Sequence, residues 1–303
     1  MILQAIAGAA GVGMAALGWS VAETRAFVVR EAEARVLPVG RSPLRVLHVS
    51  DLHLTARQRR KQEWIRSLAA LEPDLVINTG DNIAGADAVE PLLAAMSGLL
   101  DRPGAFVNGS NDYWAPRPRN PLVYLGGPTE QHGKPQPLPT TSLTDGMSRA
   151  GWIDLNNQRG DLVVAGQKLS FVGVDDPHIR RDKFPASGPV SRTHIGVAHA
   201  PYQRVLEAMS QDGADIVFAG HTHGGQVRVP GFGALVTNCD LPRWRARGLS
   251  IWPARRGAKS RGTEDLWLHV SAGAGTNPYT PFRFACRPEA TLVTLLPKDA
   301  GPA

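Results

Sequence analysis

Short apolar runs, each followed by a polar turn, recur along the chain and predict strands that are buried on both faces. The clearest runs cover residues 44–49, 73–78, 193–198 and 215–219. Amphipathic stretches predict helices near residues 60–71, 88–100 and 201–210. A hairpin-like pair at 162–174 and a closing strand at 290–296 complete the pattern. This alternation of strands and helices predicts an α/β protein.

Each of the four apolar runs ends beside side chains that bind metal ions. In chain order these are Asp51 with His53, then Asp81, then His199, and finally His221 with His223. In open α/β sheets, ligand sites gather beyond the carboxyl ends of the strands, so the four ends can converge although they are distant in sequence. Each side chain alone is more typical of a cap or a turn. Together they predict a metal site.

The chemistry of these donors limits the choice of metal. Carboxylates and imidazoles, with neither Cys239 nor Cys286 among them, suit divalent Mn, Fe, Zn or Mg. One ion would leave donors over, so two ions that share an aspartate are expected. That arrangement is the usual one for the hydrolysis of phosphate esters.

The order of these motifs resembles the calcineurin-like metallophosphoesterase superfamily over residues 45–296, and most of all its bacterial membrane-associated branch of YkuE- and YaeI-type phosphoesterases. The resemblance implies a four-layer αββα sandwich with two mixed β-sheets and a catalytic domain at residues 45–297, followed by a tail at 298–303. It also implies that Asp51, His53 and His223 hold a first ion, that Asp81 bridges, and that His199 and His221 hold a second. A metal-bridging hydroxide would then attack phosphorus in line.

One motif departs from the family pattern. The family supplies an amide ligand and a histidine from Gly-Asn-His-Asp or Gly-Asn-His-Glu, whereas this chain has Gly109, Ser110, Asn111 and Asp112. A serine hydroxyl is a poor ligand, so we expect Asn111 to supply the amide oxygen to the second ion. Because asparagine cannot act as an acid, either another group protonates the leaving group or the leaving group needs little help.

The first 22 residues are apolar except for a few positions, and their length is about enough to span a bilayer. We expect a single uncleaved membrane anchor, followed by a connecting segment at residues 23–44; a buried or surface helix is the alternative. Arginines after the apolar segment favour the cytoplasmic face, although glutamates lie between them.

Two stretches predict surface features around the site. Residues 113–145 are rich in Pro, Gly and Thr, so helix is not expected there, and the segment could form a substrate loop. Residues 241–262 combine seven Lys or Arg with two Trp, which, with a net charge of +6, suits an anionic membrane surface better than nucleic acid, given the apolar N-terminus. A third cluster, Asp175, Asp176 and His178, is interpreted as turn chemistry.

These observations favour a membrane-associated phosphoric ester hydrolase that acts on a phosphodiester or a lipid-linked phosphate. A nuclease or cyclic-nucleotide phosphodiesterase is the alternative within the same chemistry. A non-catalytic metal-binding scaffold of the same fold is the alternative of another class, and the departure at Ser110 is its only support.

Overall fold

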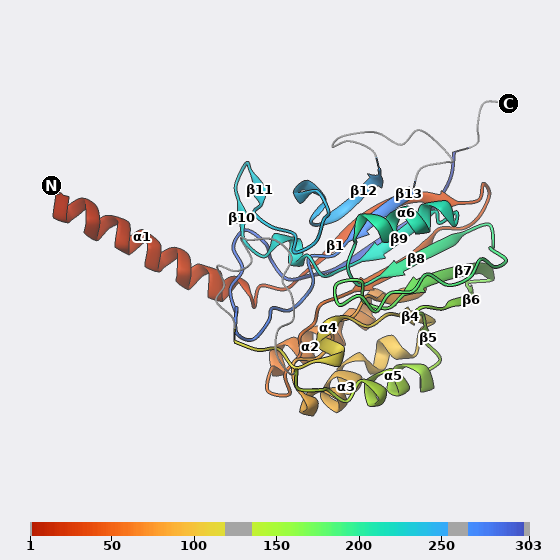
Figure 1. The fold of residues 1–303 in the computed structure, drawn as a ribbon, viewed down its shortest axis with the longest axis horizontal. Coiled ribbons are helices and arrows are strands. Elements are labelled where there is room, and N and C mark those ends of the chain that lie inside the picture. Colours follow the sequence, from red (N-terminus) through yellow and green to blue (C-terminus); the bar gives the residue numbers. More distant parts are fainter. Residues whose placement is uncertain (1, 119–134, 254–265, 300–303) are drawn as a thin grey trace.

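Two six-stranded sheets form the centre of the protein (Figure 1). The computed structural model describes residues 2–118, 135–253 and 266–299. The first sheet has the order β1 (Val28–Leu37), β14 (Glu289–Pro297), β2 (Leu44–Val49), β3 (Leu75–Asn78), β4 (Gly104–Phe106) and β5 (Ile153–Asp154). The second has the order β12 (Gly248–Trp252), β13 (Leu266–Val270), β9 (Ile216–Ala219), β8 (His194–Ala198), β7 (Gln167–Val174) and β6 (Arg159–Val164). Both sheets contain parallel and antiparallel pairs.

Helices cover the outer face of each sheet (Figure 1). The helices against the first sheet are α2 (Arg59–Ser67), which continues into η1 (Leu68–Leu71), α3 (Val89–Leu100) and α5 (Thr140–Arg149). Helix α6 (Gln203–Gln211) packs against the second sheet. The remaining elements are η2 (Ala86–Ala88), α4 (Ser110–Tyr113), η4 (His223–Gly225), η5 (Arg243–Arg245) and the hairpin of β10 (Arg228–Val229) and β11 (Gly233–Ala234).

The layers follow from the alternation of side chains along each strand. On β2, Val46 faces the core between the two sheets, whereas Leu47 faces the core under α2 and α3. On β9, Phe218 lies between the sheets and Val217 packs under α6. Strands that are apolar on both faces therefore hold four layers together, and the expected αββα sandwich is confirmed.

Two segments differ from their expected structure. Strand β1 lies within residues 23–44, which were expected to be a connection, and pairs in parallel with β14 at the edge of the first sheet. Its alternating charged residues face outward, so it lacks the continuous apolar run of a central strand. The expectation of no helix in residues 113–145 was wrong at its end, because α5 begins at Thr140 and buries Leu143 and Met147. Residues 119–134 lie outside the described part.

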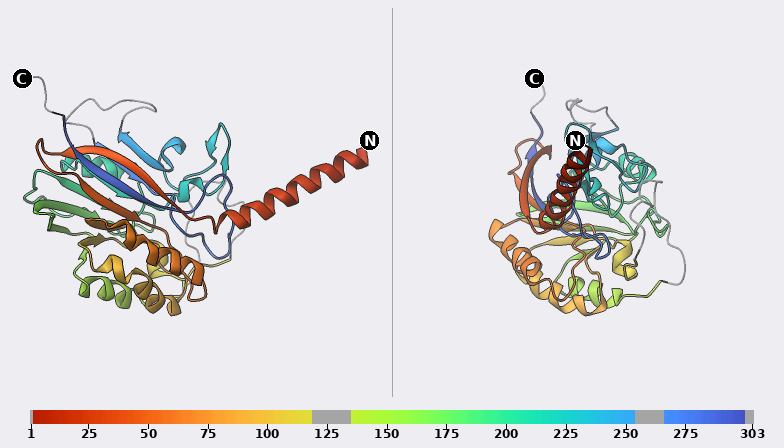
Figure 2. Two further views of the ribbon diagram at one scale, coloured as in Figure 1. Left: turned by 180° about the vertical axis from the view of Figure 1, so that it is seen from behind. Right: turned by 90° about the vertical axis from the view of Figure 1, so that its left-hand side faces the viewer.

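The N-terminal segment forms helix α1 (Ile2–Glu23), which extends away from the sheets (Figure 2). Its last turn contacts the body of the protein: the Glu23 carboxylate accepts hydrogen bonds from the backbone N–H groups of Ala285 (3.0 Å) and Cys286 (2.6 Å). Across the residues that the structure describes, no helix is both long enough and apolar enough to cross a membrane. The predicted anchor at residues 1–22 therefore gains no support from the structure.

A chain of buried hydrogen bonds links the two sheets and ends at Asp51. At neutral pH the carboxylate accepts, so Ser50 Oγ donates to Asp51 Oδ2 (2.5 Å) and Thr79 Oγ1 donates to Ser50 Oγ (2.6 Å). With its one proton used, Thr79 accepts from His48 Nε2 (2.9 Å). Burial lowers the pKa of His48 well below its usual value, so the ring is neutral and its Nδ1 accepts from His269 Nδ1 (2.8 Å). Every proton in the chain therefore points towards Asp51.

We expect Thr79→Val to lower the free energy of unfolding by about 1–3 kcal/mol, because it leaves His48 Nε2–H without an acceptor and Ser50 Oγ without a donor. Thr291→Val is the matched control. Thr291 lies opposite His48 on β14, and its buried hydroxyl has no hydrogen-bond partner among the described residues, so this variant should be no less stable than the wild type. Urea denaturation of both variants is the measurement, and an equal loss in the two would contradict the directional chain.

Candidate metal centre

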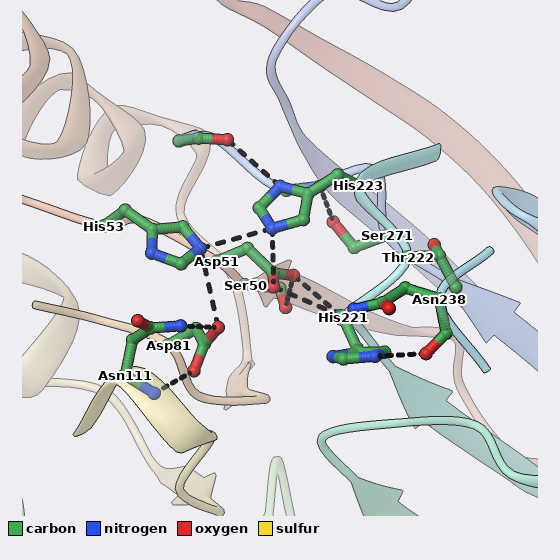
Figure 3. A network of polar contacts seen from close by, with 12 residues as sticks. Ser50, Asp51, His53, Asp81, Asn111, His221, Thr222, His223, Asn238 and Ser271 are labelled. Atoms are coloured by element: carbon green, nitrogen blue, oxygen red, sulfur yellow. Dashed lines mark hydrogen bonds and ion pairs between the residues drawn. The ribbon is translucent and has the colours of Figure 1, made fainter. Parts of the chain in front are cut away.

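The six predicted aspartate and histidine ligands lie at the carboxyl ends of strands from both sheets, and Figure 3 shows five of them, Asp51, His53, Asp81, His221 and His223, close together. Asp51 and His53 follow β2 and Asp81 follows β3, all in the first sheet, whereas His199 follows β8 and His221 with His223 follow β9 in the second. All six are buried or nearly so; the most exposed, His223, has 16% of its side chain accessible. The structure thus brings together residues that are up to 172 positions apart.

Five of these residues lie in the left-handed region of backbone conformation. Their φ angles are +49° for Asp51, +40° for His53, +55° for Asp81, +68° for His221 and +48° for His223. This conformation costs an L-residue about 1–2 kcal/mol. The backbone therefore bends sharply at the ends of β2, β3 and β9. Backbone hydrogen bonds between the turns, such as His53 N–H to Asp81 O (2.9 Å), hold the bends in place.

Gly220, the first residue of the turn that carries the two histidines, allows the two sheets to approach. A Cβ at this position would lie 2.5 Å from Asp51 Oδ2 and closer still to Ser50 Oγ. The next residue, His221, donates its backbone N–H to both oxygens of Asp51, at 3.1 and 3.0 Å. The glycine is therefore required for the second sheet to hold the carboxylate of the first.

The first group of donors has the spacing of ligands to one ion. His53 Nε2 lies 3.2 Å from His223 Nε2 and 3.5 Å from Asp81 Oδ2, and His223 Nε2 lies 3.6 Å from Asp51 Oδ1. Donor atoms that each lie about 2.0–2.2 Å from one ion are about 3–3.5 Å apart. Asp51, His53 and His223 therefore fit a metal ion.

The second group is built around His199. Its Nδ1 donates to Thr79 O (2.7 Å), so the lone pair of the neutral ring is on Nε2. That nitrogen is buried, lies 3.6 Å from Asp81 Oδ2 and has no hydrogen-bond partner in the described part of the chain. A positive charge on this nitrogen, supplied by a proton or by a metal ion, offsets the charge of the carboxylate that it faces. His221 lies beside it, with the ring centroids 5.2 Å apart, and donates from Nε2 to Asn238 O (3.0 Å), which leaves Nδ1 as its donor atom. Asp81 Oδ2 is thus within reach of both groups.

The pKa values reflect how closely these charges are packed. Burial raises the pKa of Asp51 to about 6 and lowers that of His53 to about 4. Burial also lowers the pKa values of His221 and His223 well below their usual range, so both rings are neutral donors at neutral pH. Burial opposes protonation of His199 as well, but nearby carboxylates, first of all that of Asp81, raise its pKa to about 9.

Asn111 lies against Asp81. The backbone N–H of Asn111 donates to Asp81 Oδ1 (2.7 Å) and its side-chain amide nitrogen to Oδ2 (2.8 Å) (Figure 3). Because the oxygen and nitrogen of an amide exchange places on a half-turn, the Asn111 oxygen can occupy this position beside Asp81. Asp112 locks the turn by accepting from the backbone N–H groups of Asp81, Asn82 and Gly109.

Arg283, which no sequence pattern singled out, is fully buried beside the first group. Its guanidinium donates to the carbonyl oxygens of Ala272 (2.7 Å) and Gly275 (2.7 Å), and one of its nitrogens lies 3.4 Å from His223 Nδ1. It therefore holds the turn after β13 against the metal centre. A lone arginine in an irregular segment carries no periodic signal that could have identified it.

The basic stretch at residues 241–262 was expected to point outward, and this is wrong for Arg245. That side chain is buried at 2% exposure, lies over the rings of Trp244 and Trp252, and donates to Ser250. Stacking on aromatic rings stabilises a guanidinium in a buried position. The other cations of this stretch that lie within residues 254–265 are outside the described part.

Comparison with known proteins shows the family to which the chain belongs. Residues 44–225, more than half of the chain, match the family described as calcineurin-like phosphoesterase. Phosphodiesterase YaeI of Escherichia coli is 28% identical over 150 residues, half of each chain. The metallophosphoesterase YkuE of Bacillus subtilis is 23% identical, with 87% of this chain and 82% of YkuE covered.

A further relative is the UDP-2,3-diacylglucosamine pyrophosphatase LpxG of Chlamydia trachomatis, which is 24% identical over 84% of either chain. The family match spans all four strand ends that deliver the metal-binding side chains. The chain belongs to the calcineurin-like phosphoesterase family.

Proposed function

We propose that the protein is a dinuclear-metal hydrolase that cleaves a phosphodiester or a lipid-linked phosphate. The observation that carries this proposal is the pair of buried donor groups, Asp51 with His53 and His223, and Asp51 with Asp81 and His199, in which all ligand atoms of a group lie within 4.8 Å of one another. Two neighbouring groups that share Asp51, with Asp81 Oδ2 within 3.5 Å of His53 and 3.6 Å of His199, suit two ions better than one.

In this proposal, His53 and His223 hold one ion with Asp51, and His199, His221 and Asn111 hold the other, with Asp81 between them. When bound, two divalent ions would activate water near neutral pH and stabilise charge on the phosphoryl oxygens. The protein fixes the donors beforehand: Asn111 and the Asp112 turn orient Asp81, and the hydrogen-bond chain from His269 orients Asp51.

Asn111, which stands where the family has a histidine, limits the leaving groups that the substrate can have. An amide does not donate a proton to a leaving group, so a substrate whose leaving group is already a weak base is favoured. A pyrophosphate has such a leaving group, since it departs as a phosphate ester, and the relative LpxG is named for a pyrophosphate that carries a lipid. This likeness supports a lipid-linked phosphate over the alternative of a nucleic acid.

We expect Asp81→Ala and His221→Ala each to lower Mn²⁺-dependent hydrolysis of bis(p-nitrophenyl) phosphate by at least about 100-fold, because each removes a ligand. Asp161→Ala, which removes an exposed carboxylate of β6 paired with Lys168, is the control and should keep full turnover. Full turnover in either ligand variant would refute the two-ion assignment. A wild type that binds two ions but hydrolyses none of several monoesters and diesters would favour the scaffold.

The double variant Ser110→Asn with Asn111→His restores the amide and histidine of the family motif. We expect the wild-type rate for aryl phosphodiesters to fall steeply as the pKa of the leaving phenol rises, because nothing protonates it. The double variant should show a weaker dependence on this pKa. The measurement is kcat/KM for a series of diesters with substituted phenols as leaving groups. Equal dependence on the phenol pKa in the wild type and the double variant would show that another acid already protonates the leaving group.

Helix α1 supplies the contact with lipid in this proposal, since Met14, Leu17 and Trp19 are 70%, 63% and 63% exposed. Deleting residues 2–18 preserves the contacts of Ser20 and Glu23 with the body. We expect the full chain to float with anionic liposomes and the shortened chain to remain in solution. Flotation that is unchanged by the deletion would contradict this role, and binding to nucleic acid instead of liposomes would favour the nuclease alternative.

A further inference from the structure

The turn of Asp175, Asp176 and His178 lies beside the second group of donors. It follows β7, which pairs in parallel with β8 so that Val174 lies opposite Ala198, the residue before His199. The ring of His178 packs against that of His221, with the centroids 4.4 Å apart. A segment that the sequence assigns to turn chemistry alone is therefore part of the wall around His199 and His221.

The carboxylates of Asp175 and Asp176 differ in how many of their oxygens accept hydrogen bonds from the protein. Asp175 is fully paired: Oδ1 accepts from Tyr113 (2.9 Å) and Oδ2 from Arg181 (2.8 Å). Asp176 is completely buried, and its Oδ1 accepts from the backbone N–H of His178 (2.8 Å). Its Oδ2 is buried and has no hydrogen-bond partner among the residues that the structure describes. The turn thus fixes one oxygen of Asp176 and leaves the other available.

A buried carboxylate oxygen without a partner is costly, so its surroundings call for a compensating charge. Burial raises the pKa of Asp176 to about 7; His199 is the neighbour that acts most strongly on it, and Asp81 also contributes. In turn, the Asp176 carboxylate acts on His199 more strongly than that of Asp51 does. His199 Nε2 is likewise buried and unpartnered within the described ranges. A buried carboxylate oxygen and a buried imidazole nitrogen that influence each other electrostatically, and that both lack a hydrogen-bond partner among the described residues, suit a site for a cation.

We infer that Asp176 is a further ligand of the second metal ion and binds it through Oδ2, beside His199 and His221. This assignment rests on the proposed two-ion function. In this assignment Asn111 supplies the amide that Ser110 does not, and the turn after β7 adds an anionic oxygen to the same ion. The backbone N–H of His178 orients Asp176 by holding its other oxygen.

The test compares Asp176→Asn with the wild type, both stripped of metal by chelation. The amide oxygen that this substitution introduces can still accept from His178 N–H, so an NH₂ group, which is no ligand, takes the place of Oδ2. In Mn²⁺ titration calorimetry, we expect the first equivalent to bind as in the wild type and the second to bind about 10–100-fold more weakly.

Thermal unfolding gives a second measurement, because the substitution should raise the melting temperature of the metal-free protein although it weakens metal binding. Without metal, Asp176→Asn should melt at a higher temperature than the wild type, because it removes a buried unpaired carboxylate close to Asp81. With Mn²⁺, its gain in melting temperature should be smaller than that of the wild type. A purely structural turn residue would instead lower the melting temperature of the metal-free protein, and that result would overturn the assignment.

Asp175→Asn is the matched control, since it makes the same change one position earlier in a carboxylate that already has partners. It should lower the stability of the metal-free protein and leave the second Mn²⁺ affinity within about threefold of the wild type. Equal loss of the second equivalent in both variants would overturn the role of Asp176. A wild type that binds fewer than two equivalents would instead refute the proposed function, so the two failures are distinguishable.

Discussion

The crowding of carboxylates and imidazole lone pairs in one buried space is the constraint on which the rest of this structure depends. Asp51, Asp81 and Asp176 lie close to His199, and within the described part of the chain no lysine or arginine forms an ion pair with any of the three. Several donor atoms of the site also lack a hydrogen-bond partner there. A positive charge bound among these groups, whether a proton or a metal ion, stabilises such an arrangement. The sheets, the turns and the buried hydrogen bonds around the site can all be understood as means of holding these groups in place.

The hydrogen-bond chain shows how closely fold and site are connected. His269 and His48 belong to different sheets, and the contact between their rings is also the first step in the orientation of Asp51. Asp112 has a comparable role on the other side, because one carboxylate fixes three backbone N–H groups of two separate turns. The positions of Asp51 and Asp81 are therefore set by hydrogen bonds to residues outside the proposed metal ligands, as is usual for the supporting residues of metal sites.

The strand ends were predictable from the sequence because apolar runs, sharp turns and metal-binding side chains are all local signals. The prediction that Asp51 and His223 bind the same ion depended on the family resemblance, because hydrophobic periodicity does not indicate which strands are neighbours in a sheet. Arg283 could not be identified for a related reason, because its contacts join distant segments, and the sequence indicated only turn chemistry for the cluster that contains Asp176. Strand β1 was missed because its outer face is charged, which makes an edge strand look like a linker.

The left-handed backbone at five of the proposed ligands has an evolutionary consequence. At each of these positions glycine would relieve strain, so a lineage that no longer used the site could gain stability by losing its ligands one at a time. Drift and selection for stability would then act in the same direction. This chain still carries aspartate or histidine at all five positions. We expect that only where selection for the chemical function of the site opposes both drift and selection for stability.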